Sequence, residues 1–471
     1  MTHAPTRRRL ARAAAVLAAT AVAAGAALPA AEAKPPKGDT ARVSETAKGG
    51  QINGRSIAIG LSEDGRSALF TSTAADLLPG PGTPNAEEVY VRDLRNGHVE
   101  RVSVADDGSR LDAPTADASI SADGRFVAFS TSATNVVPGQ PRRFSDVFVR
   151  DRWTGRTELV TGGGSGDDEG YSDSPSLSRD GRYVAYTSNR TDLAPGSDPR
   201  HFNVLVTDRW TGTTRVVTTG ADGGAANNTS YGVTISADGA TVGFTSRATN
   251  LLPQAPAANP AAAADTDPDP GTGTGTGTDA GAPGLAPARF YPYFVWKADT
   301  GKVSGASVDD EGTLRGVSRG SRISPDGRYA LFGLPFRIGG PGSNHFRSDL
   351  YARELATGRL TRLNAFLPGT TTTASAQDPA MTFDGHWVYF DSAADNLVPG
   401  DTNGVSDVFR RDLRTGAIER VSLTRDGGQS TSDSSDPFVD AGGGTVIFTA
   451  DDGDLVPGDT NAAADVFVRH P

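Results

Sequence analysis

An internal repeat of about 58 residues constrains this chain more than any other feature of its sequence. A turn containing glycine recurs at intervals of 59, 57, 58, 88, 58 and 58 residues. An aromatic residue follows each turn glycine by five positions, and a proline follows each aromatic residue by nine. These fixed spacings predict seven copies of one supersecondary unit. The glycines are Gly65, Gly124, Gly181, Gly239, Gly327, Gly385 and Gly443, and the aromatic residues are Phe70, Phe129, Tyr186, Phe244, Phe332, Phe390 and Phe448.

Each repeat is expected to form four β-strands. Segments such as 125–131 (RFVAFST) and 145–151 (SDVFVRD) are short, rich in β-branched and aromatic residues, and bounded by Asp-Gly and Thr-Gly turns. Their nearly continuous apolar character is typical of strands covered on both faces, whereas 98–104 (HVERVSV) alternates like an outer strand. Four-stranded antiparallel units repeated around an axis predict an all-β fold, a seven-bladed β-propeller spanning residues 41–471.

The two ends of the chain are expected to close the ring. The seventh repeat stops after its third strand at 465–470, while 41–45 (ARVSE) resembles a fourth strand that lacks the other three. Val43 precedes Gly65 by 22 residues, the same spacing that separates Val102 from Gly124 and Val421 from Gly443. The N-terminal segment should therefore complete blade seven and remove an exposed sheet edge.

The interval of 88 residues points to an insertion in blade four. Residues 254–288, between the second and third strands, are dominated by Ala, Pro, Gly, Thr and Asp. This composition cannot build a core, so we expect a disordered insertion. A tolerated surface insertion is favoured over a binding segment.

The N-terminus resembles an export signal. Residues 1–33 combine four arginines, an Ala-rich apolar stretch and an Ala31-Glu32-Ala33 cleavage motif, and 34–40 form a polar leader. A buried Ala-rich helix is the less favoured interpretation, and general or twin-arginine export both remain open. We expect a secreted product with no transmembrane anchor, extracellular or, where an outer membrane exists, periplasmic.

Charge and cysteine content exclude several functions. The net charge is −11, and it becomes −14 once the signal is removed, which disfavours binding to nucleic acid or anionic lipid. The absence of Cys excludes a disulfide scaffold, a thiol nucleophile, thiolate metal ligands and a lipoprotein anchor. A monomer is expected.

The repeat resembles that of TolB-related, WD-repeat-like propellers. The matching pattern is S-x-D-G-R-x-V-A-F followed by D-V-F-V-R-D-x-x-T-G, seen at Ser121–Phe129 and Asp146–Gly155. The variant at Asn396–Asn403 (NLVPGDTN) is similar to a class of secreted bacterial propellers. The resemblance implies the propeller fold over nearly all of 41–471. It implies no particular ligand.

Catalytic motifs are not apparent. No phosphate-binding loop and no H-E-x-x-H motif occurs. The histidines after the signal fall at unrelated repeat positions, which favours surface or packing roles. They are His98, His201, His345, His386 and His470. Paired carboxylates suitable for glycoside hydrolysis remain possible among so many acidic residues.

Two loops suggest a calcium site. The loops before the third strands of blades six and seven carry the same Asp-x-Asn-x-x-x-Asp spacing, and hard oxygen ligands in a Gly-rich turn suit Ca²⁺. Side chains that cap their own backbone turn are the favoured alternative. The candidate ligands are Asp401, Asn403, Asp407, Asp459, Asn461 and Asp465. No other cofactor is expected.

Three functions follow from these patterns. The leading hypothesis is a non-catalytic propeller that binds a ligand, protein or polysaccharide on its loop face or at the mouth of its central channel. The alternatives are a carbohydrate-active enzyme and an oligomeric cell-envelope scaffold.

Overall fold

The computed structural model describes residues 1, 40–79, 86–115, 117–139, 144–162, 170–253, 290–309, 312–318, 320–338, 345–451 and 454–471. Within these residues the regular structure consists of strands β1–β29, and no helix occurs. Residues 2–39, which hold nearly all of the predicted signal and leader, and the predicted insertion 254–288 lie outside the described residues.

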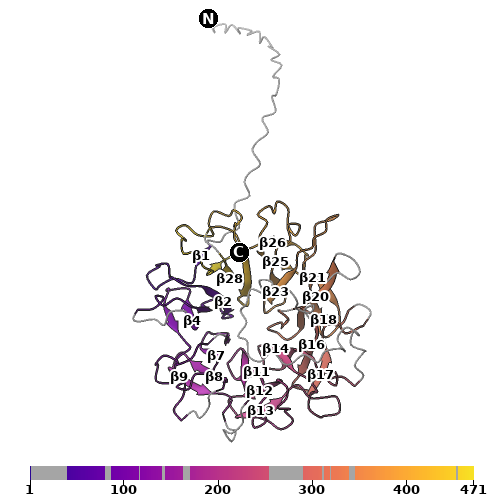
Figure 1. Ribbon diagram of the computed structural model, residues 1–471. Helices are drawn as coiled ribbons and strands as arrows, with labels where there is room; N and C mark the ends of the chain where they lie inside the picture. Colours follow the sequence, from indigo (N-terminus) through magenta and orange to yellow (C-terminus); the bar gives the residue numbers. More distant parts are fainter. Residues whose placement is uncertain are drawn as a thin grey trace. The chain divides into compact units, whose positions relative to one another are not determined.

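The strands form seven small antiparallel sheets arranged around a central axis, as Figure 1 shows, so the predicted seven-bladed β-propeller is confirmed. Each blade is assembled from strands consecutive in sequence, apart from blade seven. Blades one to three contain β2 (Ser56–Leu61), β3 (Ser67–Ser72), β4 (Glu88–Asp93) and β5 (Val99–Arg101); β6 (Ala118–Ile120), β7 (Phe126–Thr131), β8 (Asp146–Asp151) and β9 (Arg156–Leu159); and β10 (Ser172–Leu177), β11 (Tyr183–Ser188), β12 (Asn203–Asp208) and β13 (Thr213–Val216).

The remaining blades repeat this order. In blade four a short extra strand, β18 (Gly316–Val317), also pairs with β16. Blades four to seven contain β14 (Ser230–Ile235), β15 (Thr241–Ser246), β16 (Tyr291–Lys297) and β17 (Lys302–Gly305); β19 (Arg322–Ile323), β20 (Tyr329–Ile338), β21 (His345–Glu354) and β22 (Leu360–Arg362); β23 (Ala376–Met381), β24 (Trp387–Ser392), β25 (Asp407–Asp412) and β26 (Ile418–Arg420); and β27 (Ser434–Val439), β28 (Val446–Ala450), β29 (Asp465–Arg469) and β1 (Ala41–Arg42).

The N-terminal strand completes blade seven, as the spacing of Val43 predicts. Ala41 pairs with Val468 and Arg42 pairs with Phe467 in an antiparallel register. Val43 then donates its N–H to the carbonyl of Val466 at 2.7 Å, the bond that the matching fourth-strand residue makes in the other blades. This pairing covers the edge of β29 and closes the ring with strand hydrogen bonds.

The core lies within and between the blades. All seven aromatic residues that follow the turn glycines are fully buried. In six blades this residue stacks on an aromatic residue of the third strand, as Phe129 does on Phe148 with ring centroids 5.7 Å apart. In blade three Tyr186 faces Leu205 instead. The second and third strands are therefore buried on both faces, as their continuous apolar sequences predict.

In five of the blades, an arginine near the end of the third strand binds the blade to the preceding one. Each donates from Nη1 to a backbone carbonyl beyond the fourth strand of the neighbouring blade. The bonds are Arg92 to Glu45, Arg150 to Ala105, Arg353 to Val308, Arg411 to Leu363 and Arg469 to Leu423, at 2.9–3.4 Å. Charge-assisted bonds of this kind link successive blades independently of the apolar core.

Backbone hydrogen bonds also link the turns between first and second strands around one end of the axis. The turn of each blade donates an N–H to the carbonyl of the next turn. The bonds are Asp64 to Ala122, Ala122 to Arg179, Arg179 to Ala237, Ala237 to Pro325, Phe383 to Ala441 and Ala441 to Glu63, at 2.7–3.2 Å. Pro325 has no N–H to donate to blade six. There, Arg328 Nη2 donates to the carbonyl of Asp384 at 2.9 Å.

Candidate functional site

The predicted calcium ligands lie in two equivalent loops, and in each loop the two aspartates contact an arginine of the fourth strand. In blade six, Arg420 Nη2 lies 2.6 Å from Asp401 Oδ1, and Arg420 Nε lies 3.3 Å from Asp407 Oδ2. In blade seven, Arg42 makes the same contacts with Asp459 (2.9 Å) and Asp465 (3.4 Å). All six of these side chains are nearly inaccessible to solvent.

The two asparagines bind protein atoms. Asn403 Nδ2 donates to Asp407 Oδ2 at 2.8 Å and to the carbonyl of Ser430 at 2.9 Å. Asn461 Nδ2 donates to the carbonyl of Ile52 at 2.9 Å. These bonds anchor each loop to the segment that leads into the next blade.

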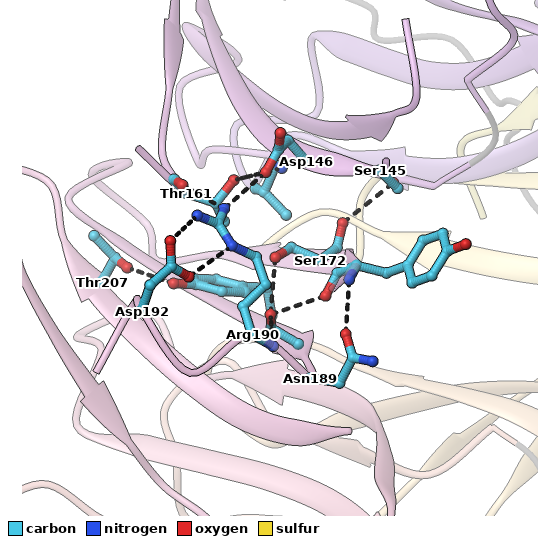
Figure 2. A network of polar contacts seen from close by, with 12 residues as sticks. Ser145, Asp146, Thr161, Ser172, Asn189, Arg190, Asp192 and Thr207 are labelled. Atoms are coloured by element: carbon cyan, nitrogen blue, oxygen red, sulfur yellow. Dashed lines mark hydrogen bonds and ion pairs between the residues drawn. The ribbon is translucent and has the colours of Figure 1, made fainter. Parts of the chain in front are cut away.

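A carboxylate at the start of the third strand recurs in other blades together with a basic partner. Glu88 lies 3.0 Å from Arg101, and Asp349 lies 2.9 Å from Arg362. Blade two has Leu159 where those blades have the arginine. Its Asp146 instead meets the buried Arg190 of blade three, whose Nη1 also donates to the carbonyl of Thr161 at 2.7 Å, as Figure 2 shows. The recurrence favours a structural role for the pairs.

Burial perturbs the titration of these acids. Burial raises the pKa of Asp465 to about 6, against the opposing effects of Ser44 and Arg42. Burial likewise raises the pKa of Asp407, against the hydrogen bonds from Ser422 and Asn403. A divalent cation would reach these oxygens only by displacing the guanidinium groups. Within the described residues no group of three or more His, Asp or Glu side chains is arranged to hold a metal ion. Calcium binding stays a prediction.

A second group of carboxylates lies on the innermost strands, at the end of the axis where these strands begin. The first strand of a blade packs against the first strand of the next, as β10 does against β6 and β14. Four of these strands, and the segment before β19 in blade five, place a residue with positive φ at the same structural position. They are Ser174 (55°), Gly232 (63°), Gly320 (82°), Asp378 (48°) and Asp436 (52°).

Two of the five are glycines, for which this left-handed conformation is easy. The serine and both aspartates adopt it at a cost of about 1–3 kcal/mol each. Each of these three also precedes a proline, which further restricts its backbone. A β-bulge interrupts the pairing of the first strand with the second at this point, for example between Gln377 and Ala380. The bulge is thus a recurrent feature of the fold, whereas the acidic side chains on it are particular to blades six and seven.

The two aspartates on the bulges lie close to a third. Asp391 of β24 is buried, and its Oδ1 has no hydrogen-bond partner among the described residues. Burial raises the pKa of Asp391 well above its ordinary value, and the negative charges of Asp378 and Asp436 raise it further. Blades six and seven therefore bring three carboxylates together near the axis.

Blades two and three contribute a second pair. Ser174 Oγ donates to Asp117 Oδ2 at 3.4 Å. Asp117 is exposed, yet desolvation by the surrounding protein raises the pKa of its carboxyl. Burial also raises the pKa of Asp173, and the charge of Asp117 adds to the rise. We call Asp117, Asp173, Asp378, Asp391 and Asp436 the axial carboxylates.

Sequence reasoning missed the axial carboxylates. The available signal was the occurrence of Pro175, Pro379 and Pro437 within first strands, because proline inside a strand marks a bulge. The bulges place Asp378 and Asp436 near one another although each belongs to a different repeat.

The opposite end of the axis carries a different arrangement. Arg179 Nε lies 3.2 Å from Glu63 Oε2, and its guanidinium stacks on Phe383 at 5.0 Å, so blades one, three and six meet there. A hollow of about 400 Å³ beside this contact is lined by Glu63, Asp64, Ala122, Asp123, Arg179 and Asp180. The contact lies beside the ring of backbone hydrogen bonds.

Comparison with known proteins gives similarity of fold alone. No protein family and no curated sequence matches the chain. Among solved structures, TolB from Acinetobacter baumannii is 14% identical over 82% of this chain and 77% of that one, with a TM-score of 0.36. A putative TolB from Agrobacterium tumefaciens is 14% identical over 88% and 90%, with a TM-score of 0.32. TolB proteins, which the repeat resembles, are thus among its structural neighbours.

Peptidases that contain a propeller are similar as well. An acylaminoacyl peptidase from Pyrococcus horikoshii is 12% identical over 85% of this chain and 49% of that one, with a TM-score of 0.46. This chain spans about half the length of that enzyme. Separately, no helix in the described part of the chain is long and apolar enough to cross a membrane.

Proposed function

We propose that the protein is a secreted, non-catalytic propeller that binds a cationic peptide segment of a protein partner at the axial carboxylates. The observation that carries the proposal is the left-handed backbone of Asp378 and Asp436. Glycine occupies the same position in blades four and five, so the fold does not require the more costly residue there. Strained conformations of this kind cluster at functional sites.

The chemistry of the cluster favours a cationic ligand. Three carboxylates lie near one another in blades six and seven, and each charge opposes ionisation of Asp391. Lysine and arginine side chains supply several hydrogen-bond donors together with a positive charge, so they would relieve the repulsion among these carboxylates. The net charge of −14 after removal of the signal would attract such a ligand from a distance.

Secretion is supported by the predicted signal. The Ala31-Glu32-Ala33 cleavage motif and the arginines before it are the observations on which it rests. Mass determination of the exported protein tests it, and a mature chain that begins at residue 34 is the expected result.

The binding proposal is tested with fluorescein-labelled hexalysine and residues 34–471 of the protein. Fluorescence anisotropy should show saturable binding that weakens as salt is added, because the interaction is electrostatic. Asp378→Asn and Asp436→Asn together should weaken binding about tenfold or more, whereas Asp222→Asn, which removes an exposed charge elsewhere, should not. Equal binding by all three proteins, or equal binding of labelled hexaglutamate, would overturn the proposal.

A further inference from the structure

Two tryptophans are exposed at the same place in neighbouring blades. Trp153 and Trp210 lie in the turns between third and fourth strands of blades two and three, and they are 68% and 67% exposed. The same turn position holds Arg95, Asp299, Ala356 or Arg414 in other blades. The fold therefore does not need tryptophan there. These turns lie at the end of the blades opposite to the axial carboxylates, because alternate connections of an antiparallel sheet emerge on opposite sides.

Each tryptophan is held by an identical set of contacts. The guanidinium of Arg125 lies between Phe126 and Trp153, 4.6 and 4.7 Å from their ring centroids. Arg182 lies between Tyr183 and Trp210 in the same way, at 4.8 and 4.7 Å. One face of each indole is thus covered by an arginine, and its high exposure leaves the other face to solvent.

Carboxylates fix these arginines in place. Asp151 accepts Arg125 Nε at 3.0 Å and Nη2 at 2.7 Å, and its Oδ1 also accepts the backbone N–H of Trp153 at 3.0 Å. Asp208 binds Arg182 at 3.0 and 2.6 Å, and its Oδ1 accepts the N–H of Trp210 at 3.0 Å. The hydrogen bonds from the arginines lower the pKa of both carboxyls to about 2. The pairs therefore stay ionised over the physiological range.

We propose that Trp153 and Trp210 form a binding surface for a linear, neutral polysaccharide, with one sugar ring stacked on each indole. A sugar ring presents an apolar C–H face and a hydroxyl edge, which match a free indole face beside an Arg–Asp pair. The charges of both arginines are balanced by their aspartates, so the surface favours an uncharged ligand. Two identical sites in consecutive blades match a polymer of repeated units, which can occupy both at once.

The surroundings disfavour a protein partner at this place. Interface hot spots lie at the centre of an apolar patch that excludes water. The other large exposed apolar side chains among the described residues are Met1, Tyr231 and Phe336. Tyr231 lies on an innermost strand, and Phe336 lies in β20 of blade five. The groups that contact the tryptophans are predominantly charged, as the preceding contacts show.

Affinity electrophoresis of residues 34–471 tests the proposal, with hydroxyethyl cellulose, xylan, glucomannan or glycol chitin in the gel. At least one of these polymers should retard the protein. Trp153→Ala and Trp210→Ala should each weaken retardation about tenfold, because each removes one of two linked sites, and the double variant should not be retarded. Phe336→Ala is the matched control for loss of an exposed aromatic residue, and it should behave as the wild type.

The variants should fold like the wild type, because blade five forms the same turn with Ala356. The melting temperatures of the variants should match that of the wild type. Ligand addition should also change the tryptophan fluorescence of the wild type and not that of the double variant. The proposal is overturned if none of the four polymers retards the wild type, or if the double variant is retarded equally.

Discussion

Arg42 and Asp459 lie 2.9 Å apart, although one belongs to the first strand of the propeller and the other to the loop before its last strand. The same arginine contacts Asp465 at 3.4 Å. A buried ion pair thus accompanies the strand hydrogen bonds that close the ring. Blade six provides an internal reference, because Arg420 makes the equivalent contacts within a continuous stretch of chain.

Removal of residues 34–46 should destabilise the protein strongly. The deletion removes β1, leaves the edge of β29 unpaired and leaves Asp459 and Asp465 without their arginine. We expect a large fall in the melting temperature measured by calorimetry. A truncated protein that melts within a degree or so of the intact one would contradict the closure of blade seven by this segment.

Single substitutions separate the contribution of the ion pairs to stability from that of the strand pairing. Arg42→Ala and Arg420→Ala should each lower the free energy of unfolding by about 3 kcal/mol, because each leaves two buried carboxylates unpaired. Arg425→Ala, which removes an exposed side chain, should change it by less than about 0.5 kcal/mol. Urea unfolding measures all three. Effects as small as that of Arg425→Ala would show that the pairs do not stabilise the blades.

The buried Arg190 should stabilise the contact between blades two and three at least as much as Arg42 and Arg420 stabilise their own blades. It binds Asp146 of blade two at 3.0 Å and Asp192 of its own blade at 2.7 Å, as Figure 2 shows. Arg190→Ala should cost about 3–5 kcal/mol of unfolding free energy. Asp146→Leu together with Arg190→Met should recover part of that loss, because the fully buried Asp146 charge is removed and only the half-buried Asp192 stays without its arginine. A double variant no more stable than Arg190→Ala would contradict this explanation.

The pH dependence of stability should report on Asp391. Its folded-state pKa lies above the unfolded value of about 3.9, so its ionisation weakens the folded state as the pH rises above about 4. Asp391→Asn should therefore melt at a higher temperature than the wild type at pH 7, and the difference should vanish towards pH 4. Asp395→Asn, an exposed neighbour in sequence, is the control. A difference in melting temperature that stays constant between pH 4 and pH 7 would contradict the raised pKa of Asp391.

Calcium binding has a direct test in the two loops that suggested it. If Ca²⁺ displaces Arg420 and Arg42 from the carboxylates, millimolar Ca²⁺ should raise the melting temperature by mass action. The double variant Asp401→Ala/Asp459→Ala should show no such rise relative to its own calcium-free state. Calorimetric titration of chelator-treated protein with no heat, and unchanged melting, would leave these residues with their structural role alone.

The fold could be predicted because its determinants repeat in the sequence. The spacing of Val43 located the closing strand, and the aromatic residue after each turn glycine located the core of each blade. Contacts between individual side chains could not be predicted in this way. The sequence shows Asp401 and Asp407 near one another, but only the strand register places Arg420 between them.

The candidate binding sites could be predicted from the sequence even less well, because they depend on how residues of different repeats pack together. Asp378 and Asp436 belong to different repeats, and their proximity to Asp391 follows from two bulges and the angle between blades. Trp153 and Trp210 are visible as exceptions to the repeat, but their exposure and their arginine partners required the packed structure.

Replacing the two left-handed aspartates by glycine tests the central claim most directly. Asp378→Gly/Asp436→Gly reproduces the residue that blades four and five carry at this position, so it should relieve backbone strain and leave the melting temperature unchanged or raised. The same preparation should bind labelled hexalysine at least about tenfold more weakly than the wild type. Unchanged hexalysine binding together with a lowered melting temperature would show that the aspartates serve the fold, and would contradict a binding site at the axis.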